Sequence, residues 1–142
     1  MKHFKNLGSI IFPEYSGIIV NMMPILFGTT SSIPQNLHGY LPLIEKCVGL
    51  KKGKVAYLPI HESFVKEGTT HRRPGIHTDG TKKDPWGGGG WGKRGLFMAS
   101  SDGCCKIWNC KIDAENVNEH GGLLTGINQR ITPKITEPNS LY

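Results

Sequence analysis

Several features that would assign a protein to a class at once are missing from this chain. The most apolar N-terminal stretch, residues 17–27, is too short to span a bilayer. Pro13 and Glu14 interrupt any signal-like run before it, and no internal repeat is found. These absences predict a soluble, intracellular protein, and we do not expect a membrane partner.

The cysteines lack the spacing of a zinc ribbon. The chain has four of them, Cys47, Cys104, Cys105 and Cys110, and no two are separated by two residues. The vicinal pair at 104–105 is a poor start for a disulfide framework. Reduced thiols in an intracellular protein are therefore the simplest interpretation.

A basic tail and a basic helical stripe are also absent. The formal net charge is +6, but the basic residues occur as scattered short pairs: Lys51-Lys52, Arg72-Arg73, Lys82-Lys83 and Lys93-Arg94. This pattern is typical of a solvated basic surface. Nucleic-acid binding has only the net charge in its favour, and we do not expect it.

The glycine-rich loop over residues 81–94 is not a phosphate-binding loop. Gly87 to Gly90 are not followed by Gly-Lys-Ser/Thr. Trp86 and Trp91 flank the four glycines. The loop is either a mobile lid with aromatic contacts or a segment that the tryptophans pin onto the domain, and we prefer the second interpretation.

What is present indicates a mainly β protein. The chain has 142 residues with 19 Gly and 9 Pro, which favours one domain over 1–142 with strands joined by turns. Alternating and β-branched runs predict five strands, over Ile18–Val20, Val55–Ile60, Pro74–Asp79, Leu96–Ala99 and Lys106–Asn109. We expect an α+β fold built as an antiparallel β-sandwich or barrel.

One amphipathic stretch near the N-terminus predicts a helix over about Pro34 to Val48. Its apolar residues recur at helical spacing: Leu37, Tyr40, Leu41, Ile44 and Val48. Ser32 is a candidate cap, and Pro42 should kink or split the helix. A second, short helix is predicted from Ala114 to His120, ending at Gly121.

The strongest candidate for chemistry is the segment around His77 and Asp79. Residues two apart on a strand point to the same face, so the imidazole and the carboxylate should project together. A second histidine would complete a facial triad of two histidines and one carboxylate, which leaves coordination positions open. The alternative is a surface strand on which the two side chains only bind each other.

The segment Arg73-Pro74-Gly75-Ile76-His77-Thr78-Asp79-Gly80 resembles the proximal metal motif of the iron(II)/2-oxoglutarate-dependent dioxygenases. The wider match covers most of residues 18 to 110, with pieces at 21–24, 57–63 and 95–101. The resemblance implies a double-stranded β-helix, a cupin-like sandwich with an N-terminal helix here. It also implies an Fe(II) cofactor and 2-oxoglutarate as co-substrate.

The end of the chain departs from the dioxygenase pattern. The resemblance calls for a distal histidine on a late strand and, about ten positions later, a basic residue that binds 2-oxoglutarate. His120 and Arg130 have that spacing, and Arg73 is a second candidate for the carboxylate. Alternatively, His120 lies in solvent at a helix end. The distal strand would then follow Tyr142, so that the fold and the site are incomplete.

The resemblance implies an iron(II)/2-oxoglutarate-dependent oxygenase acting on an unidentified small molecule or protein. The alternative is a non-catalytic cupin-like binding or structural protein with a degenerate metal site. His61 and His71 are further candidate ligands, or else surface residues. A missing late strand would leave an open sheet edge, so we also expect a homo-oligomer.

Overall fold

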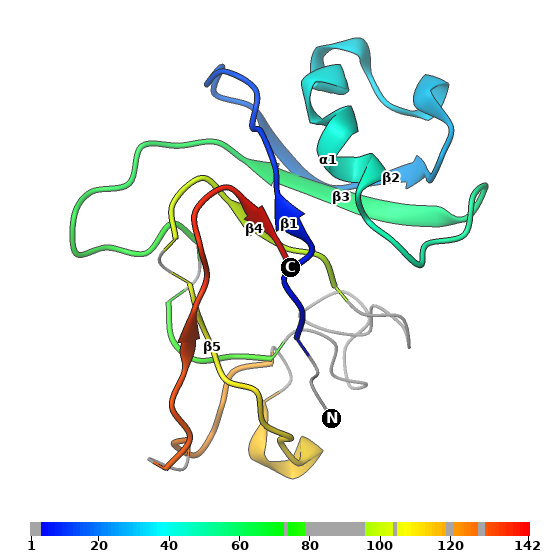
Figure 1. Ribbon diagram of the computed structural model, residues 1–142. Coiled ribbons are helices and arrows are strands. Elements are labelled where there is room, and N and C mark those ends of the chain that lie inside the picture. Colours follow the sequence, from blue (N-terminus) through cyan, green and yellow to red (C-terminus); the bar gives the residue numbers. More distant parts are fainter. Residues whose placement is uncertain (1–3, 73, 79–95, 104, 119–120, 128–129) are drawn as a thin grey trace. The chain divides into compact units, whose positions relative to one another are not determined.

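The structure is a computed structural model that describes residues 4–72, 74–78, 96–103, 105–118, 121–127 and 130–142 (Figure 1). Within these ranges it contains mainly small antiparallel sheets and one short α-helix. The prediction of a mainly β fold is therefore confirmed. None of the helices in the described ranges has the length and apolar character needed to cross a bilayer.

The chain divides into two compact units. One comprises Ser9–Arg72, and the other comprises Met1–Gly8 together with Arg73–Tyr142. The first unit holds β2 (Ile19–Leu26), β3 (Val55–His61) and the N-terminal helical segment, and the second holds His77. The single domain over 1–142 stays a prediction, because two compact units can belong to one folding domain.

In the first unit, β2 (Ile19–Leu26) pairs antiparallel with β3 (Val55–His61). The register shifts once between Val20↔Ile60 and Met23↔Leu58, so Asn21 and Met22 together face Pro59. Met22 has a φ of 50° at this bulge. Pro59 has no N–H to give to a ladder, and a bulge is a position where a strand tolerates proline.

The predicted helix over 34–48 is present in a different form. It comprises the 3₁₀ segment η2 (Gln35–Tyr40), then α1 (Leu41–Glu45), with Pro42 in the first turn of α1. Pro42 thus splits the helix as expected, because proline fits a first turn and not an interior. The predicted cap by Ser32 is wrong. Ser32 ends η1 (Thr30–Ser32), where its hydroxyl accepts a bond from Leu26 N at 3.0 Å.

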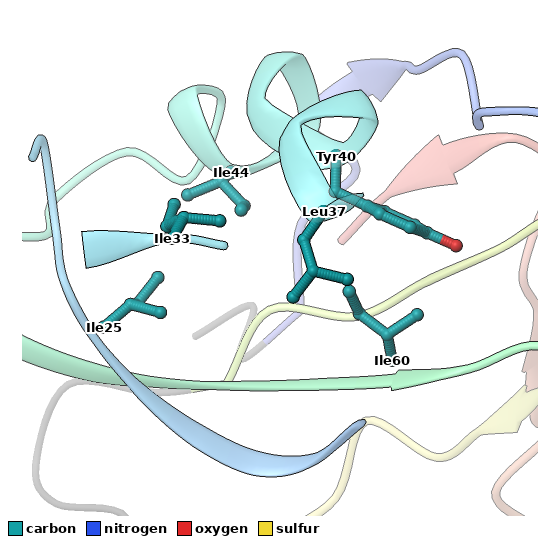
Figure 2. Close-up of a cluster of buried hydrophobic side chains, with 6 residues drawn as sticks. All are labelled: Ile25, Ile33, Leu37, Tyr40, Ile44 and Ile60. Atoms are coloured by element: carbon teal, nitrogen blue, oxygen red, sulfur yellow. The ribbon is translucent and has the colours of Figure 1, made fainter. Parts of the chain in front are cut away.

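The helical segment covers one face of β2 and β3. The buried cluster between them contains Ile25, Ile33, Leu37, Tyr40, Ile44 and Ile60. Figure 2 shows Leu37 pointing from the helical segment toward Ile60 on β3. Helical spacing places Leu37, Tyr40 and Ile44 on one side of the cluster, and the strands supply Ile25 and Ile60 on the other.

The carboxylate of Glu62 fastens the end of this sheet. It accepts hydrogen bonds from Ser16 N at 2.8 Å, Ile18 N at 3.0 Å and the Tyr40 hydroxyl at 2.5 Å. Gly17, with a φ of 74°, lets the loop curl around the acceptor. Burial by itself would raise the pKa of Glu62, but the bonds from Tyr40 and the backbone of residues 16–18 lower it to about 2.

The second unit contains very short strands. One sheet has the strand order β1 (Gly8–Ser9, at the unit boundary), β7 (Ser140–Leu141) and β4 (Ala99–Ser100). In a separate sheet, β5 (Lys106–Ile107) pairs with β6 (Lys134–Ile135). Tyr142 stacks on Phe4 with ring centroids 4.6 Å apart, which joins the first described residues to the last.

Three predicted strands in this unit are largely wrong. Residues 74–78 contain one isolated bridge at His77, and position 79 lies outside the described residues. Of Leu96–Ala99 only Ala99 is in a strand, and Lys106–Asn109 shortens to β5. These segments bond to chain distant in sequence, and each such contact spans only a few residues, too few to form a full strand.

We predict that Glu62→Gln destabilises the first unit at neutral pH and weakens its dependence on acid. The folded pKa of about 2 lies below the ordinary 4.5. The charged form is therefore favoured by folding, and its contribution is present above pH 4.5 and lost as the pH falls toward 2. The variant should lose about 1 kcal/mol or more of unfolding free energy at neutral pH. Urea denaturation from pH 7 to pH 2 measures this, with Glu67→Gln as control. Equal pH profiles for the two variants would contradict the anchoring role.

We also predict that Leu37→Ala costs about 2–5 kcal/mol of unfolding free energy, because it opens a cavity in the core. Leu37 is 1% exposed, whereas Leu26, at 42%, offers a control truncation of the same size. Urea denaturation followed by circular dichroism compares the two. A Leu26→Ala loss as large as that of Leu37→Ala would show that the helical face is not the core.

Candidate metal centre

His77 lies on an exposed turn of chain in the second unit. Gly75, two residues earlier, has a φ of 84°, a conformation that glycine adopts without strain. Nδ1 of His77 is 3.0 Å from the carbonyl oxygen of Gly75. When Nδ1 carries the proton and donates it to this carbonyl, Nε2 keeps its lone pair and is the nitrogen available to a metal.

The residues beside His77 bond to the segment 121–123. Thr78 N donates to Gly121 O at 2.8 Å, Leu123 N donates to Ile76 O at 3.0 Å, and His77 forms a bridge with Gly122. These bonds form a short antiparallel ladder between two parts of the chain more than forty residues apart.

The segment 121–123 is itself held by a hairpin. Val117 bridges Leu123, Asn118 N donates to Gly122 O, and the Asn118 side chain accepts from Gly122 N at 2.8 Å. A Cβ on Gly122 would come within 2.8 Å of Asn118 Nδ2, so a larger residue there would have to displace the Asn118 side chain. The described helix here, η3 (Ala114–Asn116), is shorter than the predicted 114–120 and is followed by extended chain.

Of the predicted site residues, the structure places His77 and Arg130, both exposed. Asp79, His120 and Arg73 lie outside the described residues, as does the whole loop over 81–94. Among the residues that are described, no three His, Cys, Asp or Glu side chains gather as metal ligands would.

The structure brings together two other histidines that the sequence offered only separately. His61, the last residue of β3, and His71 lie with ring centroids 4.9 Å apart and ring planes at 81°. Both residues are exposed. Partial desolvation, followed by the charges of His61 and Arg72, lowers the pKa of His71. Ten positions separate the two in sequence, so no periodicity could reveal the pair.

Two further titratable groups serve packing. Burial raises the pKa of the Cys47 thiol to about 11, which keeps it protonated and unreactive at neutral pH. Burial, and then the bond and charge of Glu62, raise the pKa of Tyr40. Its hydroxyl therefore stays a hydrogen-bond donor.

Comparison with known proteins leaves the family open. No protein-family model, curated protein or solved structure matches the chain. The resemblance of the segment around His77 to dioxygenases therefore carries only what its own residues support.

Proposed function

We propose that the chain is an iron(II)/2-oxoglutarate-dependent oxygenase whose metal ion is held by His77, Asp79 and His120. The proposal includes the fold: the small antiparallel sheets would form part of a double-stranded β-helix. Its substrate would be a small molecule or a protein. A ferrous ion held by two histidines and one carboxylate keeps open positions for a co-substrate and oxygen, and so can support substrate oxidation.

The ladder between residues 76–78 and 121–123 is the observation that favours this site. Thr78 N donates to Gly121 O. Asp79 follows Thr78 directly in the chain, and His120 directly precedes Gly121. Each of the two is one peptide bond from a hydrogen-bonded residue, and consecutive Cα atoms are only about 3.8 Å apart. Both remaining ligands are therefore neighbours in sequence of the two residues that this hydrogen bond joins.

The donor set also suits the ion. The Gly75 carbonyl beside Nδ1 selects Nε2 of His77 as the donor, in the way that an outer hydrogen bond orients a ligating imidazole. The ring is exposed and accessible to an ion.

The co-substrate site rests on arginine chemistry. We propose Arg130, with Arg73 as a second candidate, for the carboxylate of 2-oxoglutarate, because a guanidinium can donate two parallel hydrogen bonds to a carboxylate. Arg130 is exposed and lies in the same unit as His77.

We predict that the purified chain binds one Fe(II) under anaerobic conditions, and that His77→Ala weakens this binding at least about tenfold, since even outer-shell changes cost that much. His120→Ala should do the same. Because His77 is exposed, circular dichroism of the variant should be unchanged. Equilibrium dialysis measures the bound iron.

The control is the double variant His61→Ala/His71→Ala, which removes two exposed histidines of the other unit and should retain iron. Oxygen uptake that depends on 2-oxoglutarate should accompany iron binding and be lost in Arg130→Ala. Iron bound without such uptake would favour the non-catalytic, cupin-like binding protein. Iron binding that survives both His77→Ala and His120→Ala would rule out the proposed site.

A further inference from the structure

The pair formed by His61 and His71 closes a short excursion of chain. The backbone leaves β3 at His61, turns at residues 66–69 and returns at His71, one residue before the first unit ends at Arg72. In the turn, Thr69 N donates to Lys66 O at 3.0 Å, and Gly68 has a φ of 77°.

The backbone on either side of the pair is fixed. His61 pairs with Ile19 across the sheet, and its neighbour Glu62 is bound by Ser16, Ile18 and Tyr40. On the other side, the Thr70 hydroxyl donates to Arg72 O at 3.0 Å, across His71. The two rings are thus presented from positions set by other bonds, which lowers the entropic cost of bringing both onto one ligand.

The spacing of the rings matches that of two imidazoles on one ion. With metal–nitrogen distances of about 2.0–2.1 Å and a near-tetrahedral angle, ring centroids are roughly 5 Å apart. The observed separation is 4.9 Å.

The ring nitrogens are also available. Within the described residues, neither His61 nor His71 has a hydrogen bond that commits a ring nitrogen, in contrast to His38, whose Nε2 is 3.0 Å from Ile33 O. The edge-to-face contact of the two rings occupies none of their nitrogens with a hydrogen bond.

We propose that His61 and His71 form a separate surface site for a divalent transition-metal ion such as Zn²⁺, with water in the remaining positions. The site uses no residue of the proposed iron centre and does not depend on it. A bound ion joins the end of β3 to residue 71 and so closes the segment 62–70 into a loop.

The test uses Zn²⁺ alone on the full chain carrying His77→Ala, which removes the proposed iron centre from the measurement. Calorimetric titration should give one zinc site. Adding His61→Ala or His71→Ala should weaken it at least about tenfold, because a direct ligand matters no less than an outer-shell one. Both residues are exposed, so neither change should disturb folding. Zinc should also slow amide hydrogen exchange of Thr69 in the parent and not in the variants.

Every outcome of this titration is informative. Absence of zinc binding by the parent overturns the proposal, and so does binding that survives both substitutions. Loss in only one variant means that a single histidine binds zinc with some other partner, which also overturns the pair. In the chain with His77 restored, zinc should still shift the NMR signals of the His61 and His71 imidazole rings. Unchanged signals would count against an independent site.

Discussion

The carboxylate of Glu62 joins three parts of the first unit that the sequence keeps apart. The carboxylate accepts hydrogen bonds from the backbone N–H groups of Ser16 and Ile18, which precede β2, and from the hydroxyl of Tyr40 at the end of η2. The backbone N of Glu62, just after β3, donates to Ile18 O. Hydrophobic burial holds the helical segment on the sheet but has no direction. The hydrogen bonds to the charged carboxylate are directional, and they hold the residue that directly follows His61 at the end of β3.

What could be predicted from sequence follows the range of the interactions involved. β3, the start of β2 and the helical segment were predicted because their patterns are local, with branched or alternating residues in the strands and one apolar stripe in the helix. The rest of β2, from Asn21 to Leu26, was missed. Pro42 was correctly expected to split the helix. The form of the split, 3₁₀ before α, was not predicted, and neither was the buried cluster that joins Leu37 and Tyr40 to Ile25 and Ile60.

Most strands of the second unit were not predicted, because their pairing partners are distant in sequence. The sequence pattern over 74–79 is compatible with more than one backbone arrangement. Residues 76 and 78 bond to the segment 121–123, more than forty positions away. His77 could be singled out from its neighbours in sequence. Its bridge to Gly122 could not, because that bridge depends on a partner more than forty residues away.

The two proposed metal sites differ in charge, but that difference alone does not decide which ion each binds. Two neutral imidazoles leave the charge of a divalent ion intact and suit zinc, copper or nickel, whereas a carboxylate adds a hard oxygen donor and partial neutralisation. Zinc outranks ferrous iron at most nitrogen and oxygen ligands. Ligand identity alone would therefore not keep zinc out of a triad of His77, Asp79 and His120. Selectivity for iron would have to come from metal availability and from the geometry imposed by the ladder at residues 76–78, while the pair at His61 and His71 needs no such discrimination.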